Sequence, residues 1–175
     1  MTIKKAWPLI LVIVGMLVCL FYSNSNAANI YVDMTLSSNI TNGTYSVLRR
    51  NSSGTDGKAF RTIQSALNAM SKGDVVIMRG GTYRVGAIII PRSVNGTAWS
   101  AGNYNTLKSY PGEWAVLDGQ NNLPAGEETA VLGHARYEKD GSQDLMYGRF
   151  ERFERKNGRT SNGAGAYGCW GSGGA

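Results

Sequence analysis

Residues 55–83 constrain the fold of this chain most, because a helix pattern, a strand pattern and a double glycine follow one another directly. Four apolar side chains recur at the spacing that places them on one face of an α-helix: Ile63, Ala66, Leu67 and Met70. We expect the Thr62 hydroxyl to cap the start of this helix and Gly73 to close its end in a left-handed conformation. Such a helix must lay its apolar face on another element.

Short apolar runs follow the helix pattern. Residues 75–78 are continuously apolar, which is typical of a strand covered on both sides in a parallel sheet. Gly80 and Gly81 then permit a sharp turn. Each of three further runs is stopped by a turn residue: 88–90 by Pro91, 107–110 by Pro111, and 115–117 by Asp118. No second long helical pattern separates them, which favours a coiled β architecture. A β-sandwich is the alternative, and the helix before the first buried strand argues against it.

Several of these segments occur together in one known family. They are NIYVD (29–33), FRTIQSAL (60–67), GDVV (73–76), RGGTY (79–83), YPGE (110–113) and VLDG (116–119). In this order they resemble the opening of secreted proteins of the pectate lyase-like superfamily. The resemblance implies an all-β fold, a right-handed parallel β-helix (solenoid) that starts with an N-terminal amphipathic capping helix. It is specific for fold and weakly specific for reaction, because lyases, hydrolases, epimerases and non-catalytic surface proteins share this cap.

The N-terminus predicts export. Lys4 and Lys5 precede an apolar stretch over 6–22, and Ala27 ends a small-x-small cleavage pattern. We expect a signal peptide over 1–27 and a β-helix domain over 28–175, in a protein that is secreted, held at the cell surface or periplasmic. An uncleaved membrane anchor is the alternative. The chain would then meet a membrane only through this segment.

The two cysteines support no internal disulfide. Cys19 lies in the signal segment, so the mature chain keeps only Cys169, which we expect to be a small buried apolar residue. The glycine-rich end, residues 169–175, reads as an interrupted coil without a cap. We therefore expect a truncated domain that is incomplete at its C-terminus and contains only the cap and the first coils.

The resemblance implies β-elimination of acidic (uronate) polysaccharide by the complete protein. Such lyases use a Lys or Arg base, and in many of them aspartate-bound calcium neutralises the uronate carboxylate. No residue of this chain matches those positions, so we assign no catalytic, cofactor-binding or metal residue and expect the fragment to be inactive. A non-catalytic surface protein that binds glycans or partners is the alternative.

The remaining polar residues have structural interpretations. We expect the dispersed Asp33, Asp56, Asp74 and Asp118 to cap turns. His134 lacks a metal-spaced partner and is expected at the surface, and Glu127 and Glu128 in a solvated loop. Residues 34–58 form a long polar loop, and residues 45–50 within it resemble an insertion whose purpose the sequence does not disclose. Its Asn-x-Ser/Thr acceptors at Asn39, Asn42 and Asn51, like a fourth at Asn95, are explained by composition.

Residues 147–159 combine basic and aromatic side chains. Such a surface could bind acidic polysaccharide by charge attraction and by stacking of sugars on rings. Secretion argues against nucleic acid as the partner. The alternative is a strand with a solvated outer face.

Overall fold

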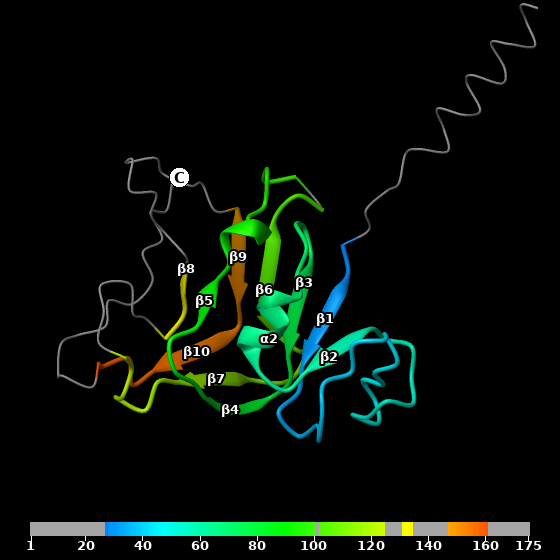
Figure 1. Cartoon of the computed structure of the whole chain (residues 1–175), viewed down its shortest axis with the longest axis horizontal. Coiled ribbons are helices and arrows are strands. Elements are labelled where there is room, and N and C mark those ends of the chain that lie inside the picture. The colour runs from blue at the N-terminus through cyan, green and yellow to red at the C-terminus, as the bar shows by residue number, and fades with distance from the viewer. Residues whose placement is uncertain (1–26, 101, 125–130, 135–146, 161–175) are drawn as a thin grey trace, which may run out of the picture.

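The computed structural model describes residues 27–100, 102–124, 131–134 and 147–160. Over these ranges the chain is mostly strands, with little helix (Figure 1). The strands are β1 (Asn29–Val32), β2 (Lys58–Phe60), β3 (Val75–Met78), β4 (Gly81–Arg84), β5 (Ile89–Ile90), β6 (Asn105–Ser109), β7 (Ala115–Asp118), β8 (Gly133–His134), β9 (Gly148–Glu151) and β10 (Phe153–Lys156). The helical elements are α2 (Ile63–Asn68) and a 3-10 turn, η2 (Arg92–Val94).

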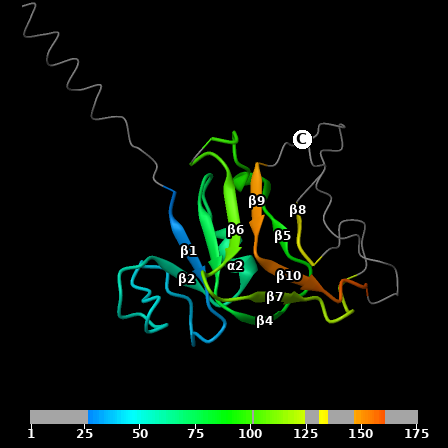
Figure 2. The same cartoon turned by 180° about the vertical axis from the view of Figure 1, so that it is seen from behind.

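The strands pair in parallel in three sheets. The first sheet has the order β2-β1-β3-β6-β9, the second β10-β7-β4 and the third β5-β8. Figure 2 shows β1, β6 and β9 in this order from left to right, with β10, β7 and β4 stacked below them and running crosswise. Along the chain β3, β4 and β5 enter the three sheets in turn, β6, β7 and β8 repeat this order, and β9 and β10 begin it again. The prediction of an all-β fold with parallel strands is confirmed.

A shared register lines side chains up across the strands of the first sheet. Ile30 lies opposite Val76, Val76 opposite Leu107, and Leu107 opposite Phe150. The first three of these residues belong to the main apolar core, which also contains residues of the second and third sheets and of α2. The strands β1, β3 and β6 therefore each add one side chain of this row to the core, whereas Phe150 on β9 is exposed at its edge.

The helix α2 covers this core as the sequence predicts. Its apolar face is buried, with Ile63, Ala66, Leu67 and the following Met70 all in the main core. The Thr62 hydroxyl accepts a hydrogen bond from the Ser65 amide at 3.2 Å, so the predicted cap is confirmed. In Figure 1, α2 lies in front of the strands of the first sheet.

The predicted helix end at Gly73 is wrong. The helix ends at Asn68, and Ala69 follows in a right-handed conformation. Gly73 does have a positive φ, of 88°, but in the turn that enters β3, where a Cβ would lie 2.1 Å from the Gly102 carbonyl oxygen. The absence of a side chain at Gly73 therefore allows these two turns to approach each other closely.

The double glycine also behaves differently from expectation. Gly81 alone has a positive φ, of 134°, and it begins β4. Residues 81–84 thus belong to a strand of the second sheet, and only Arg79 and Gly80 connect it to β3. This short connection brings the chain from one sheet into the next.

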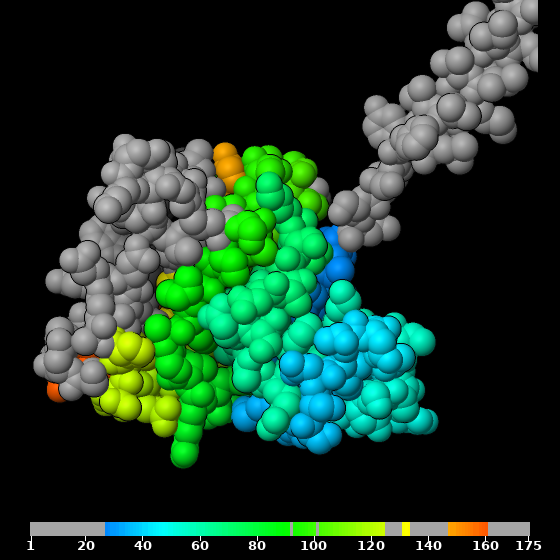
Figure 3. Space-filling view, viewed as in Figure 1, coloured from blue at the N-terminus to red at the C-terminus, as the bar shows by residue number. Residues whose placement is uncertain are grey.

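The outer face of the first sheet is covered by residues 34–57, here named the outer loop. The predicted burial of β3 on both sides is confirmed: Val76 and Met78 lie in the main core, whereas Ile77 packs in a second apolar cluster. Outer-loop side chains complete that cluster, namely Leu36, Ile40 and Tyr45. Figure 3 shows the loop as blue and cyan atoms beside the strands and α2. The predicted polar loop therefore acts as a cover for the sheet.

The described part of the chain contains no helix that is long and apolar enough to cross a membrane. The predicted signal segment falls almost wholly on residues 1–26, and the chain end on 161–175. Both lie outside the described residues, as do Cys19, Glu127, Glu128 and Cys169.

Candidate polyanion-binding surface

A group of exposed basic side chains lies on β9, on β10 and on the residues between and after them. We name this group the β9–β10 patch, and its members are Arg149, Arg152, Arg155, Lys156 and Arg159. All five residues are exposed, and the same segment holds two acidic residues, Glu151 and Glu154. The predicted strands with a solvated face are therefore present, and basic side chains outnumber acidic ones on them.

On β9, Arg149 lies on the outer face of the first sheet. It stands opposite Thr106, and Glu151 stands opposite Lys108. Arg149 and Glu151 are two residues apart on one strand, so they share a face, and they form an ion pair. The side chain of Arg149 nevertheless remains 58% exposed. Its charge is thus only partly offset and is open to a ligand in solution.

Arg152 forms the corner between the first and second sheets. It is the single residue between β9 and β10, and its φ of 54° lets the chain change direction within one residue. One terminal nitrogen of its guanidinium lies 3.5 Å from the Ser109 carbonyl oxygen. Arg152 therefore lies exposed at the edge where the two sheets meet, with its guanidinium near the backbone of β6.

On β10, Lys156 continues a row of charges across the second sheet. Arg84 lies opposite Asp118, and Asp118 lies opposite Lys156, with 3.8 Å between the Lys156 Nζ and an Asp118 carboxylate oxygen. A hydrogen bond from the Asn157 amide, then one from the Gln120 backbone, lowers the pKa of Asp118. The carboxylate thus stays ionised between two cations, and its predicted role in a turn is confirmed.

These side chains can bind a polyanion without further chemistry. Guanidinium groups present paired N–H donors that match a carboxylate, and Lys156 adds a mobile point charge. In the described ranges no group of three or more His, Cys, Asp or Glu side chains is arranged to hold a metal ion. The geometry therefore supports recognition of repeated negative charges.

A second polar constellation lies between the first sheet and the outer loop. The Asp33 side chain is fully buried, and its carboxylate accepts two hydrogen bonds from Arg50, at 2.5 and 2.8 Å. It also accepts hydrogen bonds from the Tyr45 hydroxyl at 2.8 Å and from Thr35. Burial alone would raise the pKa of Asp33, but the bonds from Arg50, Thr35 and Tyr45 outweigh it and hold that pKa well below its ordinary value.

Arg79 extends this constellation toward the turn after β6. Its guanidinium binds both carboxylate oxygens of Glu113, at 2.5 to 3.0 Å, and donates to the Val47 carbonyl at 2.7 Å. The Tyr110 ring lies 4.6 Å from it, at cation–π distance. The hydrogen bonds from Arg79, with one from the Gly80 amide, lower the pKa of Glu113. Since Asp33 and Glu113 are both occupied by protein donors, this constellation fastens the outer loop and is not a ligand site.

The sequence missed this role for Asp33 and Arg79. Asp33 caps its turn, through Thr35, and Asp74 caps the turn at Ser71, as predicted. Asp56 instead accepts a hydrogen bond from the Val47 amide, nine residues away, which joins two parts of the outer loop. The partners Arg50 and Glu113, however, lie 17 and 34 residues away from Asp33 and Arg79. No local spacing signals such a pair.

Two of the four Asn-x-Ser/Thr sequences serve turns, whereas the Asn39 side chain accepts a hydrogen bond from the distant Arg61 amide. The Asn42 side-chain oxygen accepts from both the amide and the hydroxyl of Thr44, and Asn51 does the same with Ser53. Asp33 and Thr35 repeat the arrangement, which is a local side-chain-to-backbone turn. The backbone of His134 belongs to β8 and pairs with Ile90, so its predicted surface segment contains a strand.

We compared the chain with protein-family models, curated proteins and solved structures, and none of them matches it.

Proposed function

We propose that the described strands form the first coils of a right-handed parallel β-helix similar to those of pectate lyase-like proteins. The support is the strand order, because β3–β4–β5 and β6–β7–β8 visit the same three sheets in the same sequence. A sandwich of the common kind pairs its strands antiparallel, whereas every strand pair described here is parallel. The helix α2 is the cap of this proposal, since it covers the end of the core beside β1 and β2.

We further propose that the chain binds acidic, uronate-type polysaccharide outside the cell through the β9–β10 patch. The single observation that carries this is the exposure of five basic side chains along residues 149–159, which pass from the first sheet into the second, against two acidic ones. Uronate polymers repeat a carboxylate at every sugar, so several guanidinium groups can bind one chain at once. Such repeated contacts add up although each exposed ion pair is weak.

Binding is also what the two functional classes predicted from the sequence have in common. A lyase that performs β-elimination and a non-catalytic surface protein both need to hold the glycan. The lyase needs in addition a base and a group that neutralises the uronate carboxylate. We therefore propose glycan binding for the described coils, and we expect this chain to show no calcium-dependent rise in ultraviolet absorbance on polygalacturonate.

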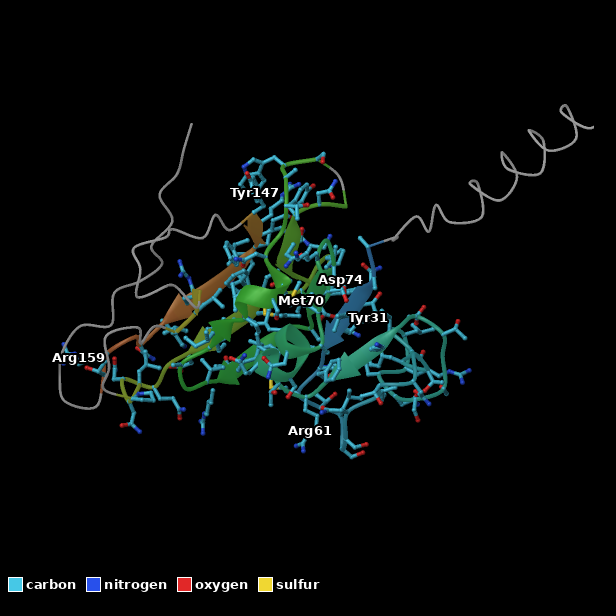
Figure 4. The ribbon with its side chains drawn as sticks, turned by 45° about the horizontal axis from the view of Figure 1, so that its top comes forward. Tyr31, Arg61, Met70, Asp74, Tyr147 and Arg159 are labelled. Atoms are coloured by element: carbon cyan, nitrogen blue, oxygen red, sulfur yellow. The ribbon has the colours of Figure 1, made fainter. Side chains whose placement is uncertain are left out.

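Charge-neutralising variants test the binding proposal. The patch variant combines Arg149→Gln, Arg152→Gln and Lys156→Gln. The control variant combines Lys58→Gln, Arg61→Gln and Lys72→Gln, which removes three exposed charges near β2 and α2, away from the patch. Figure 4 labels Arg61 below α2, far from Arg159 on the patch. Both variants lose three positive charges. A difference in affinity between them therefore reports a local binding site and not the net charge of the chain.

Electrophoresis of the full chain through gels that contain polygalacturonate reads out the affinity. The patch variant should bind roughly tenfold more weakly or worse, as expected for the loss of three ion pairs of about 0.5–1 kcal/mol each. The control variant should retain nearly all of its affinity. Equal retardation of both variants, or equal retardation of the wild type by fully methyl-esterified pectin, would refute the proposal. Preference for DNA over polygalacturonate would identify a nucleic-acid surface instead.

A further inference from the structure

Three aromatic side chains meet at the end of the first sheet where β6 and β9 begin. The Trp99 ring lies 5.4 Å from the Tyr147 ring, edge to face, and 6.0 Å from the Tyr104 ring. Trp99 is nevertheless 65% exposed, whereas the two tyrosines are half-buried beside it. We name these three residues the aromatic cluster. Figure 4 labels Tyr147 at the upper end of β9, on the far side of the molecule from Arg61.

The backbone holds this cluster in place. The Asn103 carbonyl accepts hydrogen bonds from the Thr97 and Ala98 amides, which closes the loop that carries Trp99. The Asn105 amide donates to the Tyr147 carbonyl at 3.0 Å and so joins the two tyrosine-bearing segments. Gly96 lies so close to both that a Cβ there would meet the Asn103 and Tyr147 oxygens at 2.5 and 2.6 Å. The backbone that carries the rings is thus ordered before any ligand arrives, which lowers the entropic cost of binding.

We propose that the aromatic cluster is a stacking subsite for one sugar ring of the acidic polysaccharide, with Trp99 as the platform. The axial C–H groups of a pyranose carry partial positive charge, and the face of an indole ring is negative. The cluster adjoins the charge that an acidic sugar needs, because Tyr147 directly precedes β9 and Arg149 follows it by two residues. Two residues of extended chain span about 7 Å, so a sugar stacked on the cluster would bring a neighbouring carboxylate toward Arg149.

Charge decides between a sugar and a second copy of the chain as the occupant. The chain carries a formal net charge of +6, and the β9–β10 patch that follows the cluster along the chain has five basic residues against two acidic ones. Two copies meeting here would bring like charges together, whereas an acidic glycan would neutralise them. The subsite rests on the proposed function, because both assume an acidic polysaccharide as the ligand. It differs in that it binds the uncharged sugar ring and not the carboxylate.

That difference allows a test in which the two proposals fail separately. The full chain is titrated calorimetrically with tetragalacturonate and with its fully methyl-esterified counterpart. The variants are Trp99→Ala, Trp99→Tyr and the patch variant, with Trp114→Ala as the matched control. Trp114 is 54% exposed, but it follows β6 whereas Trp99 precedes it, and no aromatic pair of the described residues includes it.

We expect Trp99→Ala to weaken binding of both oligomers on the order of tenfold, as for truncation of an aromatic anchor. Trp99→Tyr should retain most of the affinity, and Trp114→Ala should stay within twofold of the wild type. The patch variant should weaken binding of the charged oligomer alone. Unchanged binding in Trp99→Ala overturns the subsite and leaves the patch standing if the patch variant is impaired. If Trp99→Ala loses affinity and the patch variant does not, the stacking subsite is supported and binding by the β9–β10 patch is refuted.

Two further results would overturn the subsite. One is binding of neither oligomer by the wild-type chain, which would also refute the proposed function. The other is a dimer in sedimentation that Trp99→Ala dissolves, which would identify the cluster as an interface between copies. Unchanged thermal unfolding of each variant confirms that a loss of affinity is not a loss of fold.

Discussion

The hydroxyl of Tyr45 donates a hydrogen bond of 2.8 Å to the carboxylate of Asp33, and both side chains are fully buried. Asp33 directly follows β1, whereas Tyr45 lies in the middle of the outer loop. Burial, and then the hydrogen bond to Asp33, raises the pKa of Tyr45 to about 12, so its hydroxyl keeps the proton that it donates. This contact helps to hold a polar-rich segment against the outer face of the first sheet.

Removing that hydroxyl should therefore loosen the loop. We expect Tyr45→Phe to lower the free energy of unfolding by about 1–3 kcal/mol, because a buried carboxylate loses one of its donors. Tyr110→Phe is the control, since Tyr110 contributes its ring to Arg79 and the substitution keeps that ring. Urea unfolding at neutral pH compares the two. An equal loss in both variants would contradict a special role for the Tyr45 hydroxyl.

Acid should weaken the same region. Asp33 and Glu113 have pKa values below those of free carboxyl groups, so their contribution to stability is complete above the ordinary carboxyl pKa, near 4. It is lost as the pH falls from there through the lowered values. We expect stability measured by urea unfolding to decline below about pH 4. The difference between the wild type and Glu113→Gln should be largest at neutral pH and shrink in acid. A difference independent of pH would exclude Glu113 as a source of the decline.

Two glycines offer a matched test of backbone constraint. Gly73→Ala should destabilise by about 1–3 kcal/mol or more, because it combines a positive φ with a Cβ pressed against the Gly102 carbonyl. Gly86→Ala should change stability little, since a Cβ there meets nothing within 4 Å. Thermal unfolding of both variants checks this. Equal midpoints would show that the turn before β3 can rearrange.

Two leucines test the core in the same way. Leu67 on α2 is 1% exposed and Leu48 in the outer loop is 91% exposed. Leu67→Ala should cost about 2–5 kcal/mol through lost burial and a cavity, and Leu48→Ala should stay within about 0.5 kcal/mol of the wild type. Denaturant unfolding measures the free energy of unfolding of both variants, with one common slope of that free energy against denaturant concentration. A small loss in Leu67→Ala would mean that α2 is not an integral part of the core.

The sequence predicted the elements whose signals are local. The apolar spacing in α2, the Thr62 cap and the runs that became β3, β5, β6 and β7 each depend on neighbouring residues alone, and each was confirmed. The error at Gly73 arose because a glycine after a helix is also the residue that permits a close approach between turns. The sequence cannot distinguish these two uses.

Features built from distant residues were predicted poorly. The purpose of the outer loop emerged only when Asp33, Arg50, Arg79 and Glu113 were placed together across the first sheet. The aromatic cluster likewise joins Trp99 and Tyr104 to Tyr147, more than forty residues later along the chain. For the β9–β10 patch the residue types were visible, but their distribution around a corner of two sheets depended on Arg152.

The salt dependence of polygalacturonate binding tests the central proposal most directly. Exposed ion pairs are screened by salt, so the logarithm of the wild-type affinity should fall steeply as salt rises from about 0.05 to 0.5 M. The patch variant should show a lower affinity and a clearly shallower slope, and the variant without Lys58, Arg61 and Lys72 charges should match the wild type. Equal slopes in the wild type and the patch variant would contradict recognition of the polyanion by β9 and β10.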